Sequence, residues 1–194
     1  MVSAIGYPTL IRSFKLYLTV EGLRPHTIDN YCRDVVKFST ICNTLPYDVK
    51  ASNVREYIVW LRSQVSAKTV YEAQLGIRRF SRFLHAEGDI SDDPTTNMKL
   101  VKYQVIPQPA YTVNDINDLL MSCDVNDEID VRNKAIITVL FDTGVREGEL
   151  VSMHSPTFDT HQVKVSGKTG VRIVPLGTLS MQAIDRYMRR WNIV

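Results

Sequence analysis

The chain has 194 residues, 44% of them hydrophobic and 23% charged, which is typical of a globular protein with one large domain or two small ones. No stretch approaches the roughly 20 apolar residues of a membrane span, and no signal peptide pattern opens the chain, so we expect a cytoplasmic protein without a membrane partner. The net charge of +2 is unevenly distributed. Residues 1–105 hold 14 Lys and Arg against 10 Asp and Glu, and the remainder holds 9 against 11.

Four amphipathic helices are predicted in the first block, because apolar residues recur there at spacings of three and four. Gly22 with Pro25, then Pro46, and finally the run from Gly88 to Pro94 interrupt the pattern. Thr27 is expected to cap the second helix. The four apolar stripes are Leu10, Phe14, Tyr17 and Leu18; Ile28, Tyr31, Val35 and Phe38; Val54, Tyr57, Ile58 and Leu61; and Ile77, Phe80, Phe83 and Leu84.

Helical periodicity fades between residues 95 and 109, where Pro107 and Pro109 favour an extended backbone. We place the domain boundary there, which gives domains of residues 1–105 and 106–194. Thr112 and Asp115 form a predicted capping box at the start of a new helix. A second helix is expected from about Val131.

The last part of the chain is predicted to form a β-hairpin and one more helix. Apolar and polar residues alternate in Val163-Lys164-Val165, and Arg172-Ile173-Val174 is interpreted as the returning strand; a run with two glycines separates the two segments. The final helix is expected to turn its apolar residues inward: Leu179, Ile184, Tyr187, Met188 and Trp191.

Two segments of this second block carry a specific resemblance. Residues 140–150 read LFDTGVREGEL, and residues 163–177 read VKVSGKTGVRIVPLG. They resemble the segment that opens the active site of tyrosine recombinases, the phage integrase family, and that family's following hairpin. Residues 16–38, with LRPHTI, and 68–94, with FSRFL and a later DDP, are similar to the helical domain that precedes it.

The resemblance implies a mainly α-helical protein with a small β-hairpin. A helical core-binding domain of the SAM-like type would precede a truncated α+β catalytic domain. The implied function is site-specific DNA recombination or integration. The implied partner is double-stranded DNA, with a homo-oligomer on DNA and a monomer in free solution. No cofactor is implied, and no Cys or His spacing suggests a metal site.

Three residues are candidates for phosphate chemistry. Transesterification at a phosphate builds negative charge on the non-bridging oxygens, and the planar fork of the Arg146 guanidinium fits two such oxygens. Glu149 lies one helical turn further on and is expected to orient Arg146 or a backbone amide. Lys168, at the hairpin turn, is the candidate general acid for the departing 5′ oxygen.

Five cations are expected to contact DNA phosphates. Four of them surround the predicted helix that carries Phe80 and Phe83, so that its aromatic rings face inward and its cations outward. The fifth lies on the returning strand of the hairpin. The predicted DNA-binding residues are Lys68, Arg78, Arg79, Arg82 and Arg172.

The family's downstream His-x-x-Arg pair and nucleophilic tyrosine have no counterpart among the 26 residues after Lys168. Tyr187 is the only tyrosine there, and its spacing directs it toward the core. We therefore expect no DNA cleavage by this chain alone. Two further functions stay open: a non-catalytic protein that occupies or regulates recombination sites, and a helical protein-interaction module whose basic face is merely solvated.

Overall fold

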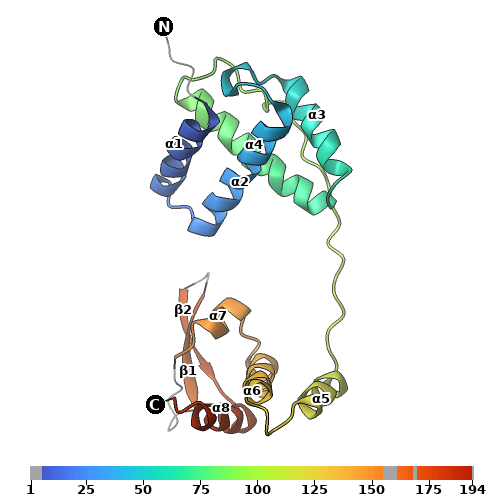
Figure 1. Ribbon diagram of the computed structural model, residues 1–194, viewed down its shortest axis with the longest axis vertical. Helices are drawn as coiled ribbons and strands as arrows, with labels where there is room; N and C mark the ends of the chain where they lie inside the picture. Colours follow the sequence, from blue (N-terminus) through green and yellow to red (C-terminus); the bar gives the residue numbers. More distant parts are fainter. Residues whose placement is uncertain (1–5, 155–160, 168–169, 194) are drawn as a thin grey trace. The chain divides into compact units, whose positions relative to one another are not determined.

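The computed structural model describes residues 6–154, 161–167 and 170–193 (Figure 1). The chain divides into two compact units, Met1–Pro107 and Gln108–Val194. The first unit contains only helices among its described residues, and the second combines helices with one antiparallel hairpin. The fold is thus mainly α-helical with a small sheet, as the sequence predicts.

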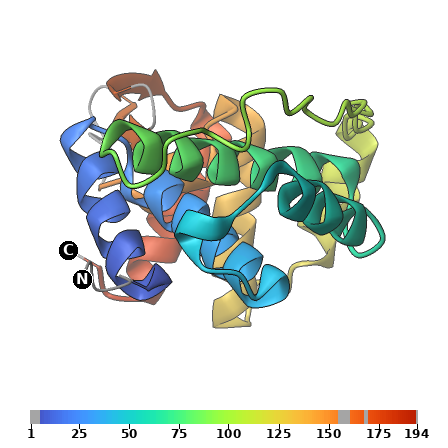
Figure 2. The same cartoon turned by 90° about the horizontal axis from the view of Figure 1, so that it is seen from above.

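From residue 6 on, where its description begins, unit 1 (Met1–Pro107) has four α-helices and one short 3-10 helix. α4 contacts each of the other three α-helices, and Figure 2 shows it (green) from another side. Its elements are α1 Tyr7–Val20, α2 Pro25–Cys42, η1 Pro46–Asp48, α3 Ala51–Arg62 and α4 Ala67–Ala86.

Local sequence explains where these helices begin and end. α2 begins at Pro25, whose fixed backbone angle suits the first helical position, so Arg24 and not Thr27 is its N-cap. The prediction of a Thr27 cap was therefore wrong. Asn43 ends α2 in the left-handed conformation that asparagine tolerates. At the start of α4, the Ser66 hydroxyl accepts a hydrogen bond from the Thr69 amide.

Two aromatic clusters form the core of unit 1, and α2 and α4 contribute to both. In the first, the fully buried Phe14 lies 5.3 Å from Phe80 and 5.4 Å from Phe83 between ring centroids. In the second, Phe38 meets Tyr57 edge to face at 5.2 Å. The shared helices join the two clusters into one packed body.

A buried glutamine holds the chain where it leaves unit 1. Gln74 on α4 is 1% exposed; its amide nitrogen donates to the Lys99 carbonyl at 3.1 Å, and its amide oxygen accepts the Val101 amide at 2.7 Å. Both ends of a buried amide are thereby satisfied. The segment 99–101 is fixed to α4, although it belongs to no helix or strand.

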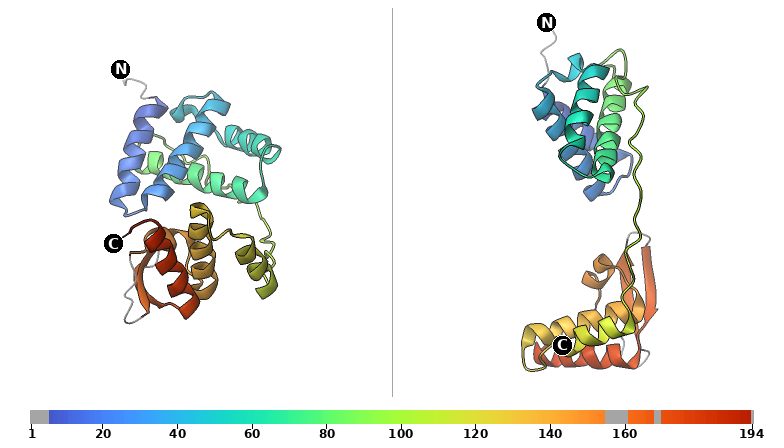
Figure 3. Two further views of the ribbon diagram at one scale, coloured as in Figure 1. Left: turned by 60° about the horizontal axis from the view of Figure 1, so that its bottom comes forward. Right: turned by 90° about the vertical axis from the view of Figure 1, so that its right-hand side faces the viewer.

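In unit 2 (Gln108–Val194), α6 and α8 lie side by side, and the hairpin contacts α7 through β1 (Figures 1 and 3). The predicted Thr112–Asp115 capping box opens α5, and both of its hydrogen bonds are formed. Val139, Val163, Val165 and Val174 are among the core residues of this unit. Its elements are α5 Val113–Ser122, α6 Glu128–Thr143, α7 Glu147–Val151, β1 Gln162–Gly167, β2 Gly170–Pro175 and α8 Thr178–Arg190.

The final helix is less buried than its pattern suggests. Leu179 is 72% exposed and Trp191 is 45% exposed, so the expectation that both turn inward was wrong. Leu179 lies in the first turn of α8, and Trp191 lies at its C-cap, where few neighbouring elements can cover a side chain. Ile184 does pack against the core of this unit.

Candidate functional site

The site begins at the turn between α6 and α7. Gly144 ends α6 with φ = +61°, a conformation that glycine adopts without strain. The Thr143 hydroxyl donates to the Val139 carbonyl at 2.6 Å and accepts the Val145 amide at 3.3 Å, and the Val145 side chain is buried. This turn makes the next residue, Arg146, the N-cap of α7.

Arg146 presents its guanidinium to solvent from this cap. Its side chain is 67% exposed, and Nη1 lies 3.3 Å from Glu149 Oε1. Its backbone amide donates to Glu149 Oε2 at 2.9 Å. Glu149 thus contacts both the amide and the side chain of Arg146, and its expected role in orienting one of them stays a prediction.

Glu149 is the buried centre of the site, with a side chain only 2% exposed. Arg172 on β2 donates to both carboxylate oxygens, from Nη2 to Oε2 at 2.9 Å and from Nε to Oε1 at 3.4 Å. The hydrogen bond from Arg172, followed by the one from the Arg146 amide, lowers the pKa of Glu149 to about 2. The carboxylate is therefore ionised between two guanidinium groups.

We predict that acid destabilises unit 2 through this carboxylate. The folded-state pKa of Glu149 lies near 2 and its ordinary value is 4.5, so ionised Glu149 stabilises the fold above about pH 4.5, and this stabilisation is lost as the pH falls toward 2. The free energy of unfolding should fall across this interval. Urea titrations that follow Trp191 fluorescence in a Trp60→Phe background would measure it at each pH.

Glu149→Gln should flatten that part of the pH profile, because glutamine does not titrate. Asp185→Asn is the matched control, since Asp185 forms an i,i+4 pair with the exposed Arg189 on α8. An unchanged acid slope in Glu149→Gln would contradict the assignment.

The hairpin approaches this carboxylate closely. β1 and β2 pair in antiparallel register from Gln162 opposite Pro175 to Gly167 opposite Gly170. A Cβ atom on Gly167 would lie 2.6 Å from Glu149 Oε1, so any larger residue there would displace the Glu149 side chain. Lys168 follows directly, and this predicted general acid lies outside the described residues.

The four predicted DNA-binding cations of unit 1 all lie on α4, but they differ in their surroundings. Lys68 and Arg82 are exposed, whereas Arg78 and Arg79 are half-buried. Arg79 forms an ion pair with Glu21, and the Nε atoms of Arg78 and Arg79 are buried without a hydrogen-bond partner among the described residues. Arg79 is thus already paired with a carboxylate of unit 1.

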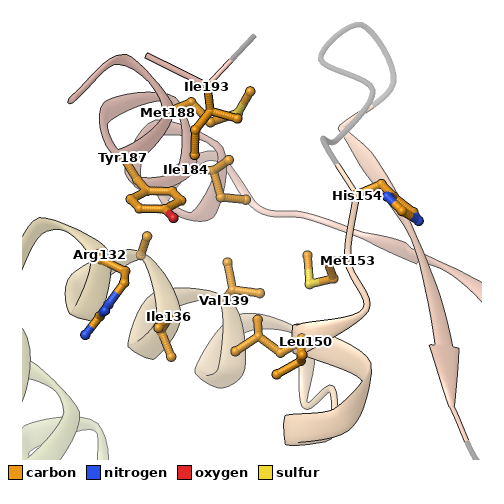
Figure 4. Close-up of a pocket in the computed structure, with 12 residues that line it drawn as sticks. Arg132, Ile136, Val139, Leu150, Met153, His154, Ile184, Tyr187, Met188 and Ile193 are labelled. Carbon is orange, nitrogen blue, oxygen red and sulfur yellow. The ribbon is translucent and has the colours of Figure 1, made fainter. Parts of the chain in front are cut away.

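A separate apolar cavity of about 410 Å³ lies between α6, α8, the end of α7 and the residues that follow α7 (Figure 4). Ile136 and Val139 line it from α6, and Ile184 and Tyr187 face them from α8. Arg146, Glu149 and Arg172 are not among its lining residues. This cavity is therefore no part of the arginine site, and it also contains the tyrosine that we discounted as a nucleophile.

Within the described ranges, no three His, Cys, Asp or Glu side chains gather in a way that would hold a metal ion. The described helices include none with the length and apolar character needed to cross a membrane.

Two contacts that hold the elements of unit 2 together could not be found from sequence patterns. The Ser152 hydroxyl lies 2.9 Å from the Ser166 carbonyl oxygen and 3.2 Å from the Ser166 amide, which ties α7 to β1. The Asp142 carboxylate accepts hydrogen bonds from the Gly177 amide at 2.7 Å and from the Ser180 hydroxyl at 2.6 Å, which ties α6 to the start of α8. Both contacts join residues that are distant in sequence, so they cannot be predicted from the spacing of neighbouring residues.

Comparison with known proteins gives a consistent picture. Residues 10–85 match the family model described as "Phage integrase, N-terminal SAM-like domain". The chain is 30% identical over 190 residues to tyrosine recombinase XerD of Halalkalibacterium halodurans, covering 92% of this chain and 63% of the relative. It is 29% identical over 186 residues to tyrosine recombinase XerC of Alcanivorax borkumensis, covering 92% and 61%. The chain thus spans less than two thirds of the length of these relatives.

Solved structures share the fold at lower identity. A lambda integrase dimer bound to a COC′ core site aligns with a TM-score of 0.74 and 16% identity, covering 93% of this chain and 68% of that one. The Tn1549 transposon integrase in complex with a circular intermediate DNA aligns with a TM-score of 0.67 and 16% identity, covering 93% and 65%.

Proposed function

Because the chain belongs to the tyrosine recombinase, or phage integrase, family, we propose that it acts in site-specific DNA recombination. In this proposal unit 1 grips duplex DNA, and Arg146 in unit 2 stabilises the negative charge that develops on the scissile phosphate. The single observation that carries it is the solvent-facing Arg146 guanidinium, supported from beneath by the buried carboxylate of Glu149.

Arg146 meets the physical requirements of this role. Its guanidinium makes one long contact with Glu149, at 3.3 Å, so most of its five donors remain available to phosphate oxygens. A guanidinium fork fits two such oxygens at once, and a preorganised cation costs little reorganisation during the reaction. Lys168 would supply the proton to the departing 5′ oxygen, and Glu149 would hold Arg146 without itself reacting.

The proposed partner is double-stranded DNA, on which the protein would act in the cytoplasm, at the nucleoid, and assemble with further copies. Structural neighbours such as lambda integrase are themselves bound to DNA, which supports this partner. Among the five cations selected from the sequence, Lys68, Arg78 and Arg82 remain the proposed phosphate contacts of unit 1. Arg79 is a weaker candidate because Glu21 already pairs with it.

We predict salt-dependent binding in which Lys68 and Arg82 each contribute one phosphate contact. Replacing either residue with glutamine should weaken binding to all duplex sequences alike, because phosphate contacts carry little base information. The slope of log K against log salt is negative, and its magnitude should decrease by about 0.9 for each lost contact. Fluorescence anisotropy with labelled duplexes at several salt concentrations measures this slope.

Arg79→Gln is the matched control on the same helix, and its effect on the slope should be smaller because its charge is paired within the protein. If the unaltered protein shows no salt-sensitive binding to any duplex, the proposed function is wrong, and a protein-interaction role is favoured. A change of sequence preference in Lys68→Gln or Arg82→Gln would mean that the residue reads bases.

A further inference from the structure

Three contacts fix the hairpin to α7. On the α7 side they involve Glu149 and Ser152, which follow Arg146 by three and six residues. The Ser152 hydroxyl bridges the carbonyl and the amide of Ser166. Gly167 rests against the Glu149 carboxylate so closely that a side chain would collide with it. The Arg172 guanidinium binds both oxygens of the same carboxylate. The end of β1, where Gly167 precedes residue 168, is therefore held in a defined position against α7.

Arg172 and Arg146 share Glu149 but differ in how they use it. Arg172 directs two nitrogens at the carboxylate, in the paired geometry that makes arginine–carboxylate contacts specific. Its side chain is 45% exposed, against 67% for Arg146, whose side chain makes one longer contact. Arg172 thus makes the closer, two-nitrogen contact with the carboxylate, whereas Arg146 is the more exposed of the two side chains.

We propose that Arg172 is a positioning residue, not a phosphate ligand: it holds the Glu149 carboxylate in place, and that carboxylate holds Arg146, while Ser152 fixes the hairpin to the same support. This inference revises the DNA-contact role expected for Arg172 and rests on the proposed function of Arg146. It also explains why the carboxylate is buried. A free Glu149 rotamer would leave Arg146 without a fixed partner, and the phosphate would then have to order the arginine at an entropic cost.

Arg172→Lys separates positioning from phosphate binding, because it keeps the charge and removes the two-pronged fork. A positioning role predicts a loss of duplex affinity of about threefold or more, since Arg146 is no longer held. The same change in an Arg146→Gln background should alter the affinity less than about twofold, because the group that Arg172 supports is already gone. Equal losses in the two backgrounds, or no loss in either, would overturn the proposal.

A second measurement does not depend on DNA. Arg172→Lys should increase the fast motion of the Arg146 Nε–Hε group, measured by 15N relaxation of the side chain. Arg186→Lys, on the exposed side of α8, is the control and should leave that motion unchanged. Unchanged Arg146 relaxation in Arg172→Lys would contradict the inference.

The two measurements also separate this inference from the proposed function. If the unaltered chain fails to bind duplex DNA, the proposed function fails, but the relaxation experiment still decides whether Arg172 positions Arg146. If the chain binds DNA and Arg146 stays equally ordered without the fork, only the positioning role fails.

Discussion

Arg146→Ala is expected to slow DNA cleavage by about 100- to 1000-fold, the usual cost of removing one preorganised donor from a developing negative charge. The measurement requires a nucleophile, so we would fuse this chain to the final third of the XerD relative from Halalkalibacterium halodurans, which is 30% identical to it. Covalent protein–DNA adducts on a nicked duplex then report cleavage. Adducts should form readily with Arg146 and only very slowly without it.

Two variants sharpen this experiment. Arg146→Lys keeps the charge but loses the fork, so its rate should lie between those of the parent hybrid and Arg146→Ala. Arg189→Ala removes one cation from the exposed face of α8 and should leave the rate unchanged. Equal adduct formation by the parent hybrid and Arg146→Ala would remove Arg146 from the mechanism.

Phe14→Ala is expected to destabilise unit 1 by about 3 to 5 kcal/mol, because it leaves a cavity in a core that cannot collapse freely. The Phe14 side chain is fully buried and contacts the rings of both Phe80 and Phe83. Those rings belong to α4, which joins the two aromatic clusters of unit 1. Urea unfolding followed by Trp60 fluorescence, with Trp191 replaced by phenylalanine, isolates the transition of this unit.

Leu16→Ala provides the control on the same helix. Leu16 is 67% exposed, so its loss should change the free energy of unfolding by no more than about 0.5 kcal/mol. Comparable destabilisation by the two variants would mean that α1 does not pack through its Phe14 face.

Much of the helical architecture follows from periodicity, because α1, α3 and α4 each bury one stripe of residues spaced by three and four. The hairpin follows from the alternation in 163–165, where Val163 and Val165 are buried and Lys164 is exposed. Periodicity says less about helix ends: it favoured Thr27 as a cap, although the proline two residues earlier begins α2.

The site was predictable only in part, for a physical reason. Residues close in sequence, such as Arg146 and Glu149, reveal their contact through helical spacing. The link between Glu149 and Arg172 spans 23 positions and depends on where the hairpin packs, which no local pattern encodes. In unit 1, the ion pair of Arg79 with Glu21 spans 58 positions, so the residues on one face of a single predicted helix could not reveal it.

The two hydrogen bonds from Gln74 to residues 99–101 bear on the length of the segment that joins the two units. The Tyr103 ring also packs against Tyr71 on α4, at 5.2 Å between ring centroids, so the chain is anchored to unit 1 as far as residue 103. Residues 104–111 then remain before the cap of α5 at Thr112. A shorter tether raises the effective concentration of one unit around a ligand held by the other. Under the proposed function, Gln74 would thereby contribute to the avidity of the chain by shortening this tether, provided that the remaining residues still span the two binding sites.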